Sequence, residues 1–503
     1  MAGAILLDEK DNVATVTAAV KVNEKITCHG GAEAKVTAIE DIPIWHKIAL
    51  ISLNKGDLVY KYGEVIGKLT ADVAKGGHIS DKNLVSVPRD YQQEYLGEAK
   101  NYQPSAASFL GDTKNEPTGF LGYRRAEGRP GIRNHVLILP TCACGSETAR
   151  IVASQVRGAV NIIFNTGCSD VAANTEMSQR VLTGFALNPN VYGVVIIGLG
   201  CETVPHNKLR EKIAGLTSKP IISFGIQEEG GTLKTIERAT RAARDMAAKA
   251  SMQAKEKFPL SELFMAIECG GSDATSGIAA NPAVGNLSDR LVALGATTMM
   301  SESIEWIGGE HVLARRGKTA KLHDEIIAVC ESYEQHLLGA GQDCRAGQPT
   351  PGNKAGGLST IDEKSLGCIR KGGTMPIAEV LAQAVRPTKT GALVMDTAGY
   401  DISSVTAMAA SGAQLCVFTT GRGTPTGNAI MPVMKVTANE HTYSLMEDNM
   451  DFDLSPIIRG EQSISECGAA MLEEVAKISS GKQTKAEVYG FSDIAVDHVC
   501  RFV

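Results

Sequence analysis

The sequence predicts an α/β protein in which a small β-rich domain at the N-terminus precedes two α/β domains with mainly parallel sheets. A chain of 503 residues is longer than one hydrophobic core usually supports, so two or three domains are expected. The first part consists of short runs in which apolar and polar residues alternate between turns, which is typical of a small β domain. From Tyr123 onward, apolar runs of strand length alternate with helical patterns, which is typical of parallel sheets covered by helices.

Residues 1–95 form the predicted β domain. Its runs "AEAKVTAI", "KIALISL" and "DLVYKYGEVIGKL" are separated by Gly, Asp and Pro, the residues that make tight turns. Residues 96–119 follow. They are polar and include two prolines, so we interpret them as a linker.

Residues 120–258 form the first predicted α/β domain. Each of four apolar runs is expected to be a buried parallel strand: "HVLILPT", "VNIIFNTG", "YGVVIIGLG" and "PIISFGIQ". Helical patterns such as "SETARIVASQV" lie between them, as a βαβ arrangement requires. A long helix rich in Ala, Lys, Arg and Glu is predicted at about 232–257, ending before Pro259.

Residues 259–503 form the second predicted α/β domain, which we expect to be the catalytic one. Its predicted strands are "LFMAIECGG", "ATTMMSES", "GALVMDTAG", "LCVFTTGRG" and "MPVMKVTA", with helices between them. The two α/β domains share the same alternation of predicted strands and helices, but no sequence repeat aligns them. We therefore predict a second domain rather than a duplication.

Composition narrows the classes of function. The net charge is -6 and no basic cluster with interleaved aromatic residues is present, which argues against a nucleic-acid partner. No apolar run approaches the ~20 residues of a membrane span, and charges come too early for a signal peptide. The twelve cysteines show no CxxC pair, and in the cytoplasm they are expected to stay reduced. We expect a cytoplasmic protein that binds a small anionic molecule and forms a homo-oligomer, as a symmetric dimer.

The carboxyl ends of the predicted strands carry cysteines, carboxylates and glycines. Ligands bind beyond these ends in open α/β sheets. The segments concerned are Cys142-Ala-Cys144-Gly, Thr166-Gly-Cys168-Ser169-Asp170, Gly198-Leu-Gly-Cys201-Glu202, Gln227-Glu228-Glu229-Gly-Gly and Glu268-Cys269-Gly-Gly-Ser272-Asp273. One interpretation is that Cys packs as a small hydrophobe and Gly turns the chain. The recurrence of such ends favours a binding site instead.

Two kinds of metal site are compatible with these residues. Convergence of three of four cysteines would create a thiolate site suited to an iron-sulfur cluster or zinc. The four are Cys168, Cys201, Cys269 and Cys368. Oxygen and nitrogen donors from Glu, Asp and His would instead suit ferrous iron, manganese or magnesium. The sequence leaves both alternatives open.

Two glycine-rich segments with cationic side chains predict an anion-binding cleft. Residues 349–373 carry Lys354, Lys364 and Lys371, and residues 419–428, "TTGRGTPTGN", carry Arg422. Neither has the GxxxxGK[ST] order of a nucleotide phosphate loop. Surface turns are the alternative interpretation, but a cation beside bendable backbone in both segments favours a small carboxylate ligand.

Two histidines of the predicted β domain are weaker candidates. His46 and His78 each precede an apolar stretch, and an isolated histidine is more often structural than functional. They would contribute to a site only if this domain packs over the strand ends.

The chain resembles the altronate/galactarate dehydratase family over nearly its whole length. The resemblance rests on long motifs in order: "GYRRAEGRPGIRNHVLILPT", "IGLGCE", "ECGGSDATSGIAANPAVG", "PGNKAGGLSTIDEKSLGCIRKGG" and "FTTGRGTPTGNAIMPVMKVTAN". The resemblance implies that the N-terminal part is a SAF-type domain, since "WHKIALISLNKGDLVYKYGEVIGKL" is similar to its core. It also implies β-elimination of water from a sugar acid to give a 2-keto-3-deoxy acid, with ferrous or manganese ion as the activator.

From this resemblance we assign expected roles to residues. Lys354 and Arg422 are expected to bind the substrate carboxylate, and proton transfer or ligation is expected of three residues, Glu302, Lys364 and His46. Lys354 is also a catalytic candidate. Further substrate-binding candidates are His78, Asn353, Ser272 and Asp273, and the metal-ligand candidates are Cys168, Cys201, Cys269 and Cys368.

The chain also departs from the family pattern, and alternatives remain. It reads "HISDKN" where the family has a histidine-rich "HVHAHN"-like segment, and "NTGCSD" where a histidine is expected shortly before the Gly-Cys pair. The related sulfolactate sulfo-lyases, which release sulfite, are one alternative. A non-catalytic sugar-acid-binding protein is another.

Overall fold

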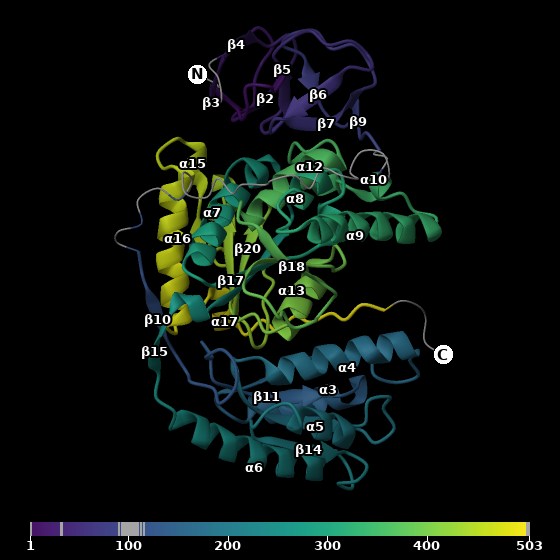
Figure 1. Ribbon diagram of the computed structural model, residues 1–503, viewed down its shortest axis with the longest axis vertical. Helices are drawn as coiled ribbons and strands as arrows, with labels where there is room; N and C mark the ends of the chain where they lie inside the picture. The colour runs from purple at the N-terminus through teal and green to yellow at the C-terminus, as the bar shows by residue number, and fades with distance from the viewer. Residues whose placement is uncertain are drawn as a thin grey trace.

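The structure is a computed structural model that describes residues 3–30, 34–88, 91, 110, 113 and 116–498. It consists of three domains in a row (Figure 1), with the N-terminal domain at one end, the first α/β domain at the other and the second α/β domain between them. The predicted fold class is confirmed. Most of the predicted linker, residues 96–119, lies outside the described residues. No described helix is both long and apolar enough to cross a membrane.

The N-terminal domain is built from two small sheets. The six-stranded sheet has the order β4-β3-β1-β2-β5-β8 and the three-stranded sheet has the order β6-β7-β9. The strands are β1 (Gly3–Leu6), β2 (Val13–Val16), β3 (Lys25–Gly30), β4 (Ala34–Thr37), β5 (Lys47–Ala49), β6 (Leu58–Lys61), β7 (Glu64–Leu69), β8 (His78–Ile79) and β9 (Leu84–Val85). Pairing is antiparallel except between β1 and β3, as short strands joined by turns allow.

The first α/β domain has a four-stranded parallel sheet in the order β12-β11-β13-β14. Its strands are β11 (His135–Pro140), β12 (Ala159–Asn161), β13 (Val191–Gly198) and β14 (Ile221–Gly225). Helices α3 (Ala143–Ser154) and α6 (Thr232–Ser251) cover one face, and α4 (Ala172–Leu187) and α5 (His206–Ala214) cover the other. Alternate strand residues enter the two cores, Val136 on one face and Leu137 on the other, which explains why the strands read as continuous apolar runs.

The predicted helix at 232–257 is too long. The helix ends at Ser251, and β15 (Glu256–Pro259) then pairs antiparallel with β10 (Gly119–Gly122). Phe120 and Phe258 of this pair enter the core of the second α/β domain, so burial of these aromatic side chains outweighs helix propensity here.

The second α/β domain has a seven-stranded parallel sheet in the order β18-β19-β17-β16-β20-β21-β22. Its strands are β16 (Phe264–Gly270), β17 (Thr297–Met300), β18 (Ile377–Leu381), β19 (Gly391–Met395), β20 (Leu415–Thr420), β21 (Val433–Thr437) and β22 (Phe452–Asp453). Helices α7 (Asn281–Ala293) and α16 (Ile464–Ser479) cover one face; α13 (Asp401–Ala410) lies on the other, where it packs against α4 of the first α/β domain. The two α/β domains therefore share a continuous core.

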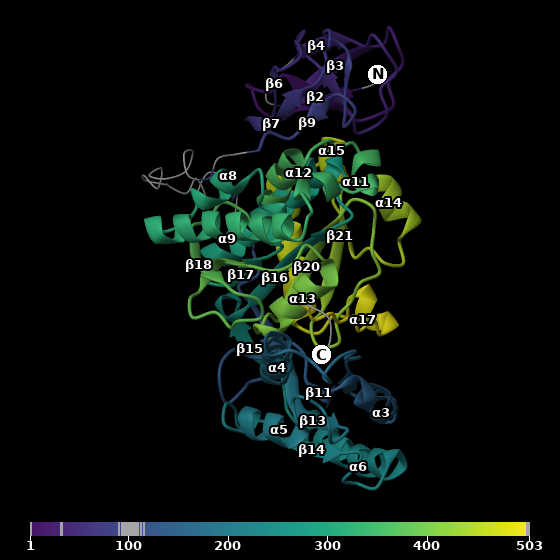
Figure 2. The same cartoon turned by 90° about the vertical axis from the view of Figure 1, so that its right-hand side faces the viewer.

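The remaining helices surround the carboxyl edge of this sheet and the rim of the domain. They are α8 (Glu310–Ala314), α9 (Ala320–Gly339), α10 (Cys344–Gly347), α11 (Pro351–Ala355), α12 (Ile361–Cys368), α14 (Glu440–Leu445), α15 (Ser455–Ile458) and α17 (Lys485–Tyr489), with single turns η1 (Leu260–Glu262), η2 (Ser276–Ala280), η3 (Ser303–Glu305) and η4 (Ile369–Gly372). Figures 1 and 2 both show the N-terminal domain seated above α12.

Candidate active site

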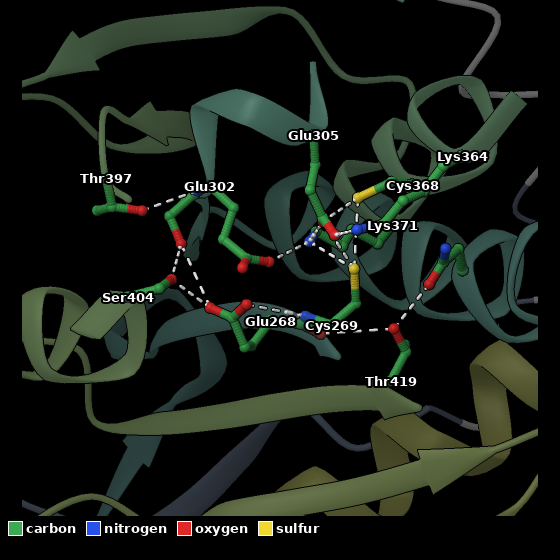
Figure 3. A network of polar contacts seen from close by, with 12 residues as sticks. Glu268, Cys269, Glu302, Glu305, Lys364, Cys368, Lys371, Thr397, Ser404 and Thr419 are labelled. Carbon is green, nitrogen blue, oxygen red and sulfur yellow. Dashed lines mark hydrogen bonds and ion pairs between the residues drawn. The ribbon is translucent and has the colours of Figure 1, made fainter. Parts of the chain in front are cut away.

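The candidate site lies where β16 and β17 end beside each other. Because β16 pairs in parallel with both β17 and β20, their carboxyl ends meet at one edge. Glu268 and Cys269 are the last side chains of β16 before Gly270, and Glu302 follows β17 two residues after its end. Figure 3 shows these side chains gathered with others from η3, α12 and η4.

Two thiols and a carboxylate form the centre of this cluster. Cys269 Sγ lies 3.3 Å from Cys368 Sγ, and Glu305 Oε2 lies 3.0 Å from the first sulfur and 2.6 Å from the second. All three side chains are buried, and their ligand atoms lie within 4.8 Å of one another. This triad is a set of donors that could hold a metal ion (Figure 3).

Two lysines compensate the charge of the triad. Lys371 Nζ lies 2.9 Å from Cys269 Sγ and 3.1 Å from Glu305 Oε2, and Lys364 Nζ lies 3.2 Å from Glu305 Oε1. Burial alone would raise the pKa of Glu305, but Lys371 and Lys364 outweigh it and lower that pKa. Burial alone would lower the pKa of Lys371, but the surrounding thiols and carboxylates raise it well above its usual value. Glu305 is therefore ionised and Lys371 protonated.

A second pair of carboxyl groups adjoins the triad. Glu302 Oε2 lies 3.5 Å from Lys371 Nζ, and Glu268 accepts a hydrogen bond from Ser404. Burial and the charges of Glu268 and Glu305 raise the pKa of Glu302 well above its usual value, which favours the protonated form of this carboxyl group. Its backbone has a φ of 68°, held by a 2.9 Å hydrogen bond from its N–H to Thr397 Oγ1. Such a conformation is costly for a residue other than glycine and is found most often at functional sites.

Asp401, the first residue of α13, lies against the backbone of Gly270. A Cβ atom at Gly270 would meet Asp401 Oδ2 at 1.9 Å, so only glycine fits there. Burial and the charges of Glu268 and Glu305 raise the pKa of Asp401 to about 7. Asp401 can therefore exchange a proton near neutral pH.

The two glycine-rich segments meet beside this cluster. Arg422 donates from Nη1 to the Gly352 carbonyl at 3.3 Å, and Asn353 donates from Nδ2 to the Ser272 carbonyl at 2.8 Å. No described residue forms a hydrogen bond or ion pair with the half-buried Lys354 ammonium, and Arg422 is exposed. Two cationic side chains are thus available to an anion at this edge.

Asp273 has a different environment from the other candidates. Its carboxylate accepts from Thr275 Oγ1 at 2.6 Å and from Asn439 Nδ2 at 2.8 Å. The Ser276 N–H also donates to it, at 3.2 Å. These contacts hold the loop after β16 in place. The Asp273 carboxylate is therefore occupied by hydrogen bonds within the protein.

The N-terminal domain packs on α12 and on the loop before it, next to the site. Lys47 is fully buried and donates to the Gly357 carbonyl, to Ser359 and to Glu363. The neighbouring His46 Nδ1 lies 2.9 Å from His78 Nε2, so the two imidazoles face each other. Burial and the charge of His78 lower the pKa of His46 to about 4, and it is neutral at pH 7. From the sequence, these histidines are expected to contribute to a site only if their domain packs over the strand ends of the sheet. The domain does cover the loop at Gly357, beside those ends.

The other two cysteines lie elsewhere. Cys168 and Cys201 are exposed and follow strands of the sheet in the first α/β domain. No described cysteine besides Cys269 and Cys368 brings its sulfur into the triad. Of the four cysteine candidates, Cys269 and Cys368 therefore meet in the second α/β domain, and Cys168 and Cys201 lie in the first. The alternative in which three of the four converge is not observed among the described residues.

Comparison with known proteins identifies the family. Family models match three consecutive parts of the chain: the altronate/galactarate dehydratase SAF domain over residues 2–87, the D-galactarate dehydratase/altronate hydrolase second domain over 122–251, and the D-galactarate/altronate dehydratase C-terminal domain over 260–501. The chain belongs to the altronate/galactarate dehydratase family. It is therefore an enzyme of the lyase class, and its N-terminal domain is a SAF domain.

Three relatives of this dehydratase-family enzyme are informative. It is 29% identical to the altronate dehydratase of Bacillus subtilis over 98% of each chain. It is 33% identical to the galactarate dehydratase (L-threo-forming) of Escherichia coli over 88% of this chain and 87% of that protein. It is 37% identical to the (2R)-sulfolactate sulfo-lyase subunit beta of Chromohalobacter salexigens over 75% of this chain and 96% of that subunit.

Sequence reasoning gave no role to several residues of this family member's site. Lys371 lies in the glycine-rich segment that the sequence analysis singled out, and Glu305 lies three residues after the candidate Glu302. Glu268 was noted at a strand end without a role. Asp401 has no motif around it, and only the approach of α13 to Gly270 brings it to the site.

Proposed function

We propose that this enzyme eliminates water from a sugar acid of the altronate or galactarate type and releases a 2-keto-3-deoxy acid. The observation that carries the proposal is the buried cluster in which three glutamates and two lysines hold a proton on Glu302 beside loops that present Lys354 and Arg422. The relatives named as dehydratases of these acids support it.

The reaction requires two proton transfers. A base removes the weakly acidic proton at C2, next to the carboxylate, and an acid protonates the C3 hydroxyl so that it leaves as water. The enol that remains then tautomerises to the 2-keto acid. A positioned acid or base contributes roughly 10²- to 10⁴-fold to the rate.

The chain offers a group for each task. Lys354 and Arg422 bind the substrate carboxylate, since their cationic ends have no stronger partner among the described residues. Glu302 supplies the proton to the leaving oxygen, and Lys371 beside it stabilises the carboxylate that remains. Asp401, with its pKa at about 7, accepts the C2 proton, and the neutral His46 is the alternative acceptor.

The donor chemistry of the triad fits a divalent metal. Two of the three donor atoms are sulfur, which favours ferrous iron over manganese. Cys269, Cys368 and Glu305 would hold the ion, and the bound ion would polarise a substrate oxygen as a Lewis acid. An iron-sulfur cluster has less support, because only two described cysteines meet here.

The test is turnover by protein purified anaerobically and supplied with ferrous iron. Altronate, galactarate, related aldonates and sulfolactate are offered separately, and 2-keto acid and sulfite are both measured. Formation of a 2-keto-3-deoxy acid without sulfite is the expected result. Absence of any 2-keto acid across the panel would contradict the proposal.

A sulfo-lyase is the second candidate. The 37% identity to the sulfolactate sulfo-lyase subunit beta exceeds the identity to either dehydratase, and an elimination that expels sulfite would use the same base and carboxylate-binding groups. Sulfite release from sulfolactate in the same panel would favour this candidate.

A further inference from the structure

A cavity lies between the two α/β domains, and none of the residues of the buried carboxyl and thiol cluster lines it. Its volume is about 400 Å³. The first α/β domain contributes His135 of β11 and Arg150 of α3, and the second contributes Asn428 from the loop between β20 and β21. Glu487 of α17 and Phe491 complete the polar and aromatic parts of the wall.

Asn428 is a buried donor without a partner. Only 5% of its surface is exposed, and its Oδ1 accepts from the Ile430 N–H at 3.1 Å. Its Nδ2 has no hydrogen-bond partner among the described residues. A buried amide donor left unpaired destabilises the protein, so a ligand that accepts a hydrogen bond from it is favoured.

The charge around the cavity favours an anion. The Glu487 carboxylate is neutralised by Arg133, whose Nε and Nη2 donate to it at 2.7 and 2.9 Å. Arg150 is exposed, and its contact with Glu147 is a surface pair between neighbouring turns of α3, which is weak. Arg150 can therefore turn to a ligand at little cost.

His135 and the apolar wall can bind the part of a small organic acid that lies beyond its carboxylate. Burial and the charge of Arg133 lower the pKa of His135 to about 4, so its imidazole is neutral and can bind a hydroxyl or keto oxygen. No described residue forms a hydrogen bond with its ring nitrogens. The remaining wall includes Met431 and Phe491, which cover carbon atoms.

We propose that this cavity is an effector site for a small organic carboxylate, held by Asn428 Nδ2 and the Arg150 guanidinium with its carbon chain against Phe491. The occupant is expected to be a carboxylate rather than a dianion such as phosphate, because the cavity offers one cation, one amide and an apolar wall.

One loop connects this cavity to the candidate active site. It begins after β20 with Gly421, which packs on Asp273, and Arg422, which reaches Gly352. It continues to Gly427, whose N–H donates to Asp493 at 3.0 Å, and to Asn428 in the cavity. A ligand that orders Asn428 therefore acts on the position of Arg422. We expect it to change KM for the substrate rather than create a second activity.

The test is titration calorimetry with pyruvate, benzoate and inorganic phosphate as probes. Wild type, Asn428→Asp, Arg150→Ala and Lys354→Met are compared. Asn428→Asp keeps the acceptor for the Ile430 N–H but replaces the donor by a carboxylate that repels an anion. Wild type and Lys354→Met are expected to bind a carboxylate probe equally, while Asn428→Asp and Arg150→Ala weaken binding at least tenfold. The probe should also change KM of wild type but not KM of Asn428→Asp, each compared with its own value without probe.

Three results would overturn the effector site. Binding that Lys354→Met abolishes and Asn428→Asp leaves intact would place the probe in the active site alone. Phosphate binding as tight as the carboxylates would contradict the ligand class. Absence of binding by both carboxylates would contradict the site. If Asn428→Asp does not fold, Arg150→Ala still tests the proposal, because Arg150 is exposed.

Discussion

Protonation decides the chemistry of the three glutamates and two lysines buried together at the end of β16. Glu305 stays ionised because Lys371 and Lys364 both contact it. Burial and the charges of Glu268 and Glu305 raise the pKa of Glu302 well above its usual value, which favours its protonated form. Glu302 thus holds its proton where a leaving oxygen could accept it.

The pH dependence of turnover should report Asp401. As a base it must be ionised, and burial raises its pKa to about 7, so kcat is expected to rise as the pH increases through about 7. Profiles of kcat from pH 5.5 to 8.5 for wild type and Asp401→Asn check this. A profile of unchanged shape in the variant would assign the proton acceptor elsewhere, with His46 next to be tested.

Lys354→Met should weaken substrate binding. The change removes one of two cations at the glycine-rich loops, so KM is expected to rise at least tenfold while the fold survives. Lys321→Met is the matched control, since the Lys321 side chain is 83% exposed and pairs only with the surface residue Glu325 among the described residues. Steady-state kinetics of both variants measure KM. Equal KM values for Lys354→Met and Lys321→Met would show that the loop carrying Lys354 does not bind the substrate.

The sequence predicts which residues lie at the candidate site better than it predicts which of them contact one another. Glu302, Lys364, Cys269 and Cys368 do meet, because strand ends and the glycine-rich segment signal a site. The pairing of Lys371 with Glu305 depends on how η3 and η4 approach each other, which no local pattern encodes.

Among the elements, the contact between the SAF domain and α12 shapes the site. Glu363 of α12 accepts from Lys47 and Lys61 of the SAF domain, each at 2.8 Å, and all three are buried. A Cβ atom at Gly357 would meet the Trp45 carbonyl at 2.1 Å, and Gly357 has a φ of +94°. Glycine is thus required for the close approach that places His46 over the loop.

Glu363→Gln should loosen this contact. Removing one partner of a buried pair costs about 3–5 kcal/mol, because Lys47 and Lys61 stay buried with no counter-charge. Urea unfolding of Glu363→Gln measures the loss. Glu461→Gln, in an exposed pair with Arg459, is the control and should change stability little, because solvent screens surface ion pairs. Equal stabilities of the two variants would contradict the role given to Glu363.

The same carboxylate predicts acid sensitivity. Burial would raise the pKa of Glu363, but Lys47 and Lys61 outweigh it and lower the pKa to about 2, from 4.5. A folded-state pKa below the unfolded one stabilises the protein above pH 4.5, and this contribution is lost as the pH falls towards 2.

Elements with strong local patterns were predictable, and those that depend on distant partners were not. The continuous apolar runs predict the central strands of both parallel sheets. Strands β18 and β22 lie at the sheet edges, where burial is partial and the apolar pattern fades. The end of α6 was missed because Phe258 pairs with a strand more than a hundred residues earlier.

For the whole molecule, the structure places the candidate site in one α/β domain and away from the other. The second α/β domain carries the candidate site and packs against the SAF domain. The first α/β domain shares a core with the second through α4 and α13. The expected homodimer stays a prediction. Sequence reasoning placed metal ligands on both sheets because their strand ends look alike.

Bound metal should depend on cysteines of the second α/β domain and not on those of the first. Cys368→Ser removes a sulfur of the triad and is expected to lower bound iron at least tenfold, because the hydroxyl is a poorer ligand for a soft site. Cys201→Ser, at an exposed position of the first α/β domain, should leave it unchanged. Iron is measured by elemental mass spectrometry after anaerobic loading. A loss in Cys201→Ser matching that in Cys368→Ser would contradict the assignment.

The turnover number of Glu302→Gln tests most directly whether the buried carboxyl cluster is the catalytic centre. The substitution keeps the size of the side chain but removes the proton donor, so kcat is expected to fall roughly 10²- to 10⁴-fold with little change in KM. Glu325→Gln, at a partly exposed position of α9, should retain full activity. A folded Glu302→Gln enzyme with the kcat of wild type would show that the proton for the leaving group comes from another residue.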